Sequence, residues 1–290
     1  MWDELRIGDL VAWRRGPADA STAIIVLHGG PGLSDYTEPL ADLVSAQLPD
    51  AQVARYQQRG VVPPSLDGPV TVEQHIEDLT VVASACAAER VVLLGHSWGG
   101  HLALHAIAAS PGSYVAAIAV DPLGGVGDGG LSKMRTALRA RCTDEAQTKL
   151  ADIAARRERE SANDVLALEE LEILWPSYFA DPNAAPAMPQ LAFGAARAAE
   201  TWASISENMR DKTLEHRLVD VATPTLFLVG GRSPIPNDAS TRTADLMSHS
   251  VVRCHPDAGH FPWIEDPAWT VDEIAGFLHA TSTDASNIAS

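Results

Sequence analysis

A serine between two glycines is the first candidate for chemistry in this chain. Residues 95–99 read Gly-His-Ser-Trp-Gly and match the pattern G-x-S-x-G. Apolar residues 91–94 precede the motif, and an Ala- and Leu-rich stretch over 98–109 follows it. A strand that turns sharply into a helix presents a serine hydroxyl above a sheet, and small flanking residues leave room for the turn. We therefore predict Ser97 as the nucleophile of an acyl transfer; the alternative is an ordinary turn between a strand and a helix.

Acyl transfer also needs N–H groups that stabilise the negative charge developing on the carbonyl oxygen. The N–H of Trp98, directly after the nucleophile, is one expected donor. The second is expected from the loop after an earlier strand, where residues 28–32 read His-Gly-Gly-Pro-Gly. We favour the N–H of Gly30, with Gly29 as second choice, and we expect His28 to brace the loop by hydrogen bonding.

A general base for Ser97 is expected late in the chain, on a loop after the last strand. The sequence contains ten histidines. Of these, His260 fits best, because it follows an apolar run that ends near Cys254 and because Gly259 lets its loop turn back toward the sheet. His255 is the nearest rival, but it stands at the end of the strand itself.

The base in turn needs a carboxylate on its second nitrogen, which holds the tautomer and stabilises the imidazolium. Asp121 lies between Ser97 and His260 in the chain and directly follows the apolar residues 114–120, so we expect it at the carboxyl edge of the sheet. We predict Asp121 as the acid. Asp238 is the alternative acid, and a site with no acid is the third interpretation.

Short β-branched, apolar runs alternate with helical patterns in much of the chain. Strands are expected at residues 22–27, 51–56, 90–94, 114–120, 225–229 and 251–254, and residues 5–15 fit an antiparallel hairpin. Thr71 and Gln74 form a capping-box pattern that predicts a helix start. Strands that are apolar on both faces are typical of a mainly parallel sheet covered by helices, so the fold class is α/β.

The strand pattern stops between about residues 124 and 219, where helical segments are expected over 132–141, 146–160 and 164–174. We interpret this stretch as a helical insertion over the carboxyl ends of the strands, where sites form in α/β sheets. Trp175, Tyr178 and Trp202 lie within it and are candidates to bind substrate; alternatively they pack the insertion onto the sheet.

Composition narrows the classes of function. The net charge of -17 argues against nucleic acid and anionic membranes as partners, since both require a basic surface. No apolar run approaches the ~18 residues that span a bilayer, and no secretory signal is visible at the start. The three cysteines show neither metal-ligand spacing nor a disulfide framework. We expect a cytoplasmic protein without metal or organic cofactor.

At this point the chain resembles the proline iminopeptidase branch of the α/β-hydrolases. The resemblance rests on the motifs at 28–32 and 95–100, on Arg-Tyr-Gln-Gln-Arg-Gly at 55–60 and on Asp-Ala-Gly-His at 257–260. It implies an α/β-hydrolase fold with an eight-stranded, mostly parallel sheet and a helical cap after the sixth strand. The core would then comprise residues 1–123 and 217–290, and the cap residues 124–216.

The sequence departs from that family at two positions. Gln57 stands where the family usually has Asp, and Ser233 stands in the place of the family's catalytic acid. The cap is the least matched part. Family members that bind a peptide amino terminus use cap carboxylates for its ammonium group, and nothing singles out one of the four available here, Glu169, Glu170, Glu172 and Glu200.

The sequence therefore predicts a serine hydrolase that cleaves an ester or amide of a small molecule or short peptide. A proline iminopeptidase-like aminopeptidase is the first specific hypothesis, and a small-molecule esterase or lactonase is the second. A ligand receptor that has lost turnover is the third, and the serine at position 233 is the feature that favours it. The sequence does not indicate an oligomeric state.

Overall fold

The structure is a computed structural model that describes residues 1–61, 67–160 and 163–288. Within these residues, eight strands form one sheet in the order β1-β2-β4-β3-β5-β6-β7-β8. The predicted hairpin pairs β1 with β2, β2 pairs antiparallel with β4, and all other neighbours are parallel. The expected α/β-hydrolase fold with a mostly parallel eight-stranded sheet is therefore confirmed. The strands are β1 (Asp3–Ile7), β2 (Leu10–Arg15), β3 (Thr22–Leu27), β4 (Gln52–Tyr56), β5 (Arg90–His96), β6 (Ala116–Val120), β7 (Thr225–Gly230) and β8 (Ser250–His255).

Helices cover both faces of this sheet, because its central strands are apolar on both sides. Along β3, Ile24 and Val26 pack in one cluster with α1 (Glu38–Gln47) and α11 (Pro267–Ile288). The alternate residues of the same strand, Ile25 and Leu27, pack in a second cluster with the helices of the opposite face. Those helices include α2 (Val72–Ala85) and α3 (Trp98–Ala109), and α9 (Asn237–Ala244) packs against β7 and β8.

The predicted start of α2 shows how local sequence sets an element's boundary. The Thr71 Oγ1 atom accepts a hydrogen bond from the N–H of Gln74 (3.3 Å), which satisfies one of the free N–H groups of the first turn. The Gln74 side chain does not complete the reciprocal bond of a capping box; it donates to Glu77 instead (2.7 Å).

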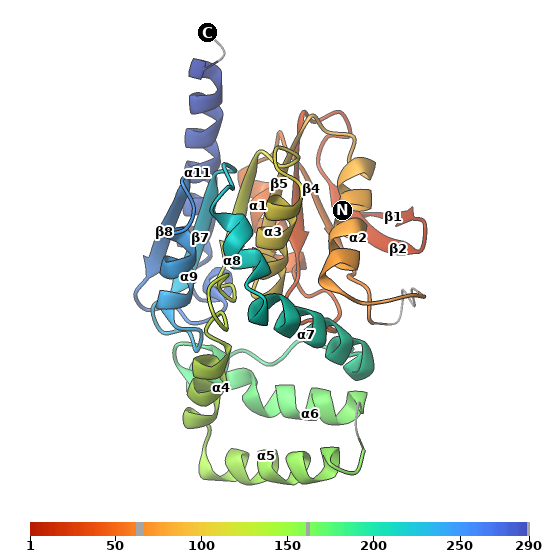
Figure 1. Cartoon of the computed structure of the whole chain (residues 1–290), viewed down its shortest axis with the longest axis vertical. Coiled ribbons are helices and arrows are strands. Elements are labelled where there is room, and N and C mark those ends of the chain that lie inside the picture. The colour runs from red at the N-terminus through yellow and green to blue at the C-terminus, as the bar shows by residue number, and fades with distance from the viewer. Residues whose placement is uncertain (62–66, 161–162, 289–290) are drawn as a thin grey trace.

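The stretch between β6 and β7 is helical. It contains α4 (Leu131–Ala140), α5 (Asp144–Arg157), α6 (Asp164–Leu174), the 3-10 helices η1 (Trp175–Tyr178) and η2 (Pro182–Ala184), α7 (Ala195–Arg210) and α8 (Thr213–Leu218). Figure 1 shows α4, α5 and α6 projecting below the sheet, with α7 between them and the helices of the core. Leu214 and Leu218 of α8 belong to the hydrophobic cluster that contains α3. This helix therefore packs on the sheet layer although it begins before residue 217.

The short helix α10 (Pro262–Glu265) follows β8 and leads into α11. None of the helices among the described residues combines the length and the apolar composition that a membrane span requires.

Candidate active site

Ser97 lies at a sharp turn between β5 and α3. Its backbone has φ 55° and ψ −118°, a conformation that L-residues rarely adopt. The turn requires glycine on both sides, since a Cβ on Gly95 would lie 2.1 Å from the carbonyl oxygen of Gly99 and a Cβ on Gly99 would lie 2.2 Å from that of Leu27. The N–H of Ser97 donates to the carbonyl of Val120 (2.9 Å), which fixes the turn to the end of β6.

His260 and Asp121 meet at the same edge of the sheet. The Nδ1 atom of His260 donates to Asp121 Oδ2 at 2.5 Å, and the two residues are only 3% and 1% exposed. With its proton on Nδ1, the neutral imidazole leaves Nε2 as an acceptor, which is the state that a general base for a serine requires. The structure thus brings the predicted base and acid together across 139 residues of chain.

Asp121 receives two further hydrogen bonds, one from the last residue of β7 and one from the loop after it. The Ser233 hydroxyl donates to Oδ2, the oxygen that also binds His260, and the N–H of Gly230 donates to Oδ1 (3.1 Å). The Ser233 oxygen in turn accepts from the N–H of Ile235 (3.0 Å), so its proton is directed at the carboxylate. Ser233, which stands in the family's usual acid position, therefore contacts the carboxylate of Asp121 and donates a hydrogen bond to that carboxylate.

The two rival residues lie elsewhere. Asp238 is on α9 with a half-exposed side chain that pairs with Lys133 at 2.8 Å. His255, at the end of β8, bonds Asp266 at 3.1 Å through Nε2.

The loop after β3 lies directly over the nucleophile. A Cβ on Gly29 would lie 3.0 Å from the Cβ of Ser97 and 2.2 Å from the Tyr36 hydroxyl. The N–H of Gly29 donates to that hydroxyl (3.0 Å). By contrast, the backbone N–H groups of Gly30 and Trp98 have no hydrogen-bond partner among the residues that the structure describes. Gly30 and Trp98 therefore have N–H groups left for an oxyanion, whereas Gly29 does not.

A chain of hydrogen bonds joins the loop after β3 (residues 28–37), called here the oxyanion loop after its expected donor Gly30, to the loop that carries His260. The Tyr36 hydroxyl donates to Nδ1 of His96 (2.6 Å), and Nε2 of His96 donates to the carbonyl of His260 (2.9 Å). This assignment is fixed at the carbonyl end, because a carbonyl accepts only. Burial lowers the pKa of His96 well below its ordinary value, so this imidazole is neutral and has one proton to donate.

Gln58 bridges the side chain of Trp98 and the loop that carries Gly30. Its Oε1 accepts from the Trp98 indole N–H (2.9 Å), and its Nε2 donates to the carbonyl of His28 (2.7 Å). His28 itself bonds the carbonyl of Gly29 (2.8 Å) through Nδ1 and accepts from the Gln58 N–H (3.1 Å) through Nε2. His28 thus braces the loop, as expected. Gln57, the residue that replaces the family's Asp, accepts from the N–H of Asp35 (2.9 Å).

Ser97 and His260 open into one small cavity of about 120 Å³, which we call the inner cavity. Its walls are apolar or aromatic, and none of its lining residues is acidic or basic apart from the histidine. They are Gly30, Leu33, Tyr36, Ser97, Leu123, Met134, Leu171, Trp175, Tyr178, Leu191, Trp202, His260 and Phe261. The three aromatic residues predicted for substrate binding are all among them. Burial raises the pKa of Tyr178 to about 12, so its phenol stays protonated at neutral pH.

A wider groove of about 830 Å³ adjoins the inner cavity and is called here the cap groove. It is bounded by α4, α6 and α7 and by the oxyanion loop. Among the residues that line the groove, Glu170 is the one with a carboxylate, and it pairs with Arg157 at 2.6 Å. The other cap carboxylates considered from the sequence do not line the groove.

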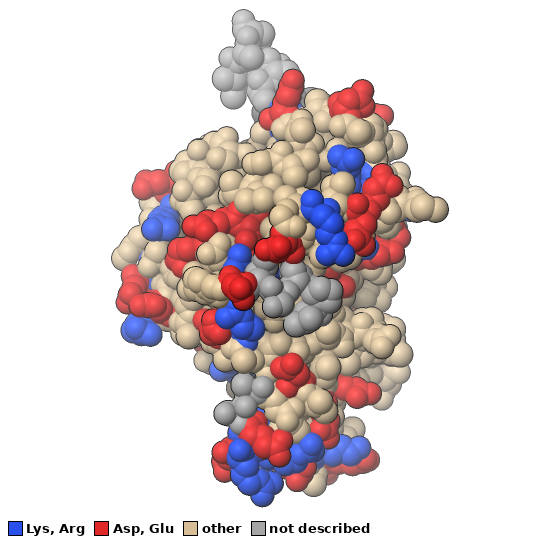
Figure 2. Space-filling view, turned by 90° about the vertical axis from the view of Figure 1, so that its right-hand side faces the viewer, with Lys and Arg blue, Asp and Glu red and all other residues tan. Residues whose placement is uncertain are grey.

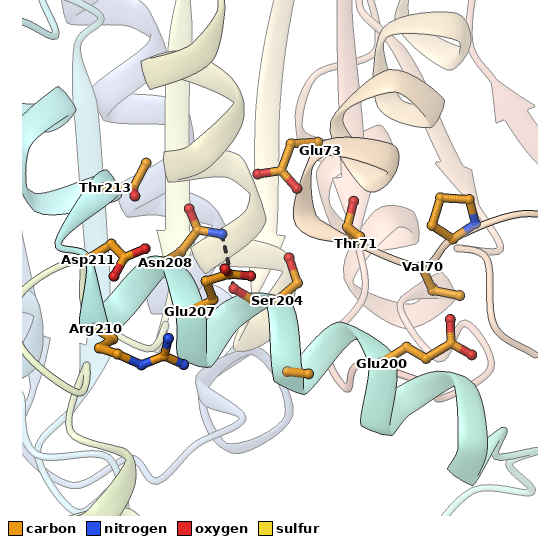
Figure 3. Close-up of a pocket in the computed structure, with 12 residues that line it drawn as sticks. Val70, Thr71, Glu73, Glu200, Ser204, Glu207, Asn208, Arg210, Asp211 and Thr213 are labelled. Carbon is orange, nitrogen blue, oxygen red and sulfur yellow. Dashed lines mark hydrogen bonds between the residues drawn. The ribbon is translucent and has the colours of Figure 1, made fainter.

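A separate hollow of about 740 Å³ lies between the start of α2 and α7 (Figure 3). The carboxylates of Glu73 on α2 and of Glu200 and Glu207 on α7 line it, together with the amide of Asn208 on α7, and none of the residues predicted for catalysis does. No group of three or more His, Cys, Asp or Glu within residues 1–61, 67–160 and 163–288 is arranged to hold a metal ion.

Sequence reasoning did not assign roles to Tyr36, Gln58 or Ser233. Gln58 lies in a quoted motif, and Ser233 was recognised only as a departure from the family. The contact of each with the site depends on neighbouring strands that are distant in the chain. The two hydrogen-bond partners of His96 were likewise not predicted.

Comparison with known proteins gives a consistent result. A family described as "Alpha/beta hydrolase family" matches residues 24–273. The proline iminopeptidase of Heyndrickxia coagulans is 24% identical over 275 residues, which cover 89% of this chain and 91% of that protein. The proline iminopeptidase of Lactobacillus crispatus (strain ST1) is 36% identical over 94 residues, and the match spans only 31% of each protein.

Two solved structures share the fold at low sequence identity. The proline iminopeptidase of Mycobacterium smegmatis has a TM-score of 0.64 at 20% identity and covers 98% of this chain and 100% of its own. A thermophilic esterase from Thermogutta terrifontis has the same TM-score and identity, with 97% and 99% covered. Proteins described as a peptidase and as an esterase are therefore equally similar in fold.

Proposed function

Because this chain belongs to the alpha/beta hydrolase family, we propose that it is a serine hydrolase that cleaves a carboxylic ester through an acyl-enzyme on Ser97. The observation that carries the proposal is the buried bond of 2.5 Å between His260 and Asp121, beside a cavity that also contains Ser97. A paired imidazole with its second nitrogen free, next to a serine on a strained turn, is the arrangement that activates a hydroxyl.

In the proposed reaction, these residues act in sequence. His260 Nε2 takes the proton of Ser97 as the serine oxygen attacks the ester carbonyl. The N–H groups of Gly30 and Trp98 stabilise the oxyanion, and Asp121 stabilises the imidazolium. The imidazolium then gives its proton to the departing alcohol. Water, activated by the same histidine, releases the acid and regenerates the serine.

The walls of the inner cavity favour an ester over a peptide amino terminus. An aminopeptidase substrate brings an α-ammonium group close to the scissile bond, and a buried charge needs a partner. The inner cavity offers no carboxylate, and the Glu170 carboxylate in the adjoining groove is already paired with Arg157. A small ester or lactone meets no such requirement.

Aminopeptidase activity is the second candidate, because the curated relatives are proline iminopeptidases. Free and N-acetylated prolyl p-nitroanilide separate the two functions. An aminopeptidase would cleave the free substrate much faster than the acetylated one, whereas equal rates, or no cleavage of either, support the esterase.

Labelling with a fluorophosphonate tests the nucleophile directly. We expect one labelled serine, Ser97, and no labelling or p-nitrophenyl butanoate hydrolysis in Ser97→Ala. Ser110→Ala, at the other end of α3, is the matched control and should behave as the parent chain. Labelling that persists in Ser97→Ala would place the nucleophile elsewhere. A parent chain that is neither labelled nor active would favour the third hypothesis, a ligand receptor that has lost turnover.

A further inference from the structure

Two arginines of α4 stand on the wall of the cap groove. Arg135 and Arg139 are four residues apart, so they lie on the same side of the helix, and both line the groove. The groove and the inner cavity share six wall residues: Gly30, Leu33, Met134, Leu171, Tyr178 and Trp202. A ligand at Ser97 that extends out of the inner cavity therefore passes into the space that these arginines border.

These arginines differ from the other cations nearby, because their guanidinium groups have no hydrogen bond or ion pair with any residue that the structure describes. Lys133, on the same helix, pairs with Asp238 (2.8 Å), and Arg141 donates to two backbone carbonyls at 2.9 and 2.7 Å. Arg157, across the groove, pairs with Glu170.

The surrounding sequence makes this concentration of positive charge unusual. Residues 129–143 contain four Lys or Arg and no Asp or Glu, in a chain whose net charge is -17. At the lower end of the molecule, on the cap, Figure 2 shows Lys and Arg side chains mixed with Asp and Glu, as the ion pairs of α5 and α6 require. Two like charges at i and i+4 repel each other and do not stabilise the helix. The positive charge of Arg139 interacts favourably with the C-terminus of α4, but Arg135 lies too far from that terminus for this effect.

We propose that the cap groove selects an ester with a short apolar part, held at Ser97, and a second part that ends in an anionic group, a carboxylate or a phosphate, bound by Arg135 and Arg139. This inference rests on the proposed ester hydrolysis and adds the class of substrate. The anion supplies the counter-charge that both guanidinium groups lack, and Arg binds either anion with paired N–H donors.

Matched substrates test the inference. The first pair consists of the butanoate ester of 6-hydroxyhexanoic acid and that of its N-methylamide, which differ only in a charge remote from the scissile bond. A second pair, ethyl hydrogen adipate and its N-methylamide, places the charge on the acyl side. A third compound, 6-(phosphonooxy)hexyl butanoate, distinguishes phosphate from carboxylate. We expect the anionic member of at least one pair to have a kcat/KM about tenfold higher, mainly through KM.

The variant Arg135→Gln/Arg139→Gln should reduce this ratio to about one. The control variant Lys133→Gln/Lys149→Gln also removes two positive charges, but from exposed positions that do not line the groove. It should leave the ratio unchanged. Added salt should also lower the ratio in the parent chain. A ratio near one in both pairs, or a ratio that survives in the arginine variant, would overturn the inference.

Binding separates a failure of this inference from a failure of the proposed function. Calorimetry on Ser97→Ala measures the affinity for each member of a pair without turnover. Preferential binding of the anion by Ser97→Ala, lost on adding Arg135→Gln/Arg139→Gln, supports the inference even if the parent chain hydrolyses neither ester. Equal binding of both members refutes it, whatever the labelling of Ser97 shows.

Discussion

Moving the carboxylate from position 121, directly after β6, to position 233, in the loop after β7, tests the proposed site. Ser233 lies beside the pair of Asp121 and His260, since its hydroxyl and His260 Nδ1 both donate to the same oxygen, Asp121 Oδ2. Asp121→Asn should lower kcat by about 10⁴-fold, because the amide cannot stabilise the imidazolium. Asn also tolerates the positive φ of 43° at this position, so the backbone should not change.

The double variant Asp121→Asn/Ser233→Asp then restores a carboxylate from the neighbouring strand. We expect it to recover at least tenfold of the activity lost in Asp121→Asn, since the new carboxylate starts within hydrogen-bond distance of the old position. The single variant Ser233→Asp is expected to behave differently. Two carboxylates about 3 Å apart repel by roughly 5 kcal/mol at an effective dielectric constant of 20, so the pair should retain one proton.

The assay is kcat/KM for p-nitrophenyl butanoate between pH 5 and 9. In Ser233→Asp a carboxyl pair that retains one proton has the same net charge as Asp121 alone, so the rising limb of the profile should stay close to that of the parent chain; a rising limb at higher pH would show that both carboxylates are ionised, because the base must lose its proton to act. Ser233→Ala is the control for loss of the hydroxyl alone. A double variant no more active than Asp121→Asn would refute the idea that the two positions serve the same imidazole, and near-normal turnover in Asp121→Asn would refute Asp121 as the acid.

Three further changes probe the surroundings of the site. Gly29→Ala should lower kcat by at least tenfold with little change in secondary structure by circular dichroism, because its Cβ would meet the Tyr36 hydroxyl at 2.2 Å and displace the oxyanion loop; unchanged kcat would contradict the close approach. Asp238→Asn should leave kcat within about twofold of the parent value, since that carboxylate pairs with Lys133; a large loss would revive the alternative acid. Burial lowers the pKa of His101 to about 4, so the unfolded chain binds a proton there below pH 6.5 and the folded chain does not. The free energy of unfolding should therefore fall by about 2 kcal/mol from this residue between pH 6.5 and 5, and urea titrations of His101→Gln should show a shallower pH dependence, which the exposed-site control His249→Gln should not.

The positions of Ser97, Asp121 and His260 at one edge of the sheet were predictable because each comes after a strand. In a parallel sheet the carboxyl ends of strands share one edge, so position in the chain alone suggests that Ser97, Asp121 and His260 meet. The helix start at Thr71 was similarly predictable from a local rule.

The links between loops were not predictable, because no short-range pattern encodes them. Tyr36 and His96 are 60 residues apart, and His96 and the carbonyl of His260 are 164 apart. Their contact depends on how far each loop rises above the sheet and on which side chain fills the space between. For the same reason, the sequence does not indicate which basic residues of the cap line the groove.

The backbone conformations of two site residues lower the stability of the fold. Of the four non-glycine residues with positive φ among the described positions, two are Ser97 and Asp121, and such conformations each cost about 1–3 kcal/mol. Glycine at either position would relieve that strain and would remove a side chain that the proposed hydrolysis requires. A lineage selected only for a durable fold would therefore tend to lose these two side chains first, so their retention in a homologue would itself indicate that hydrolysis is under selection.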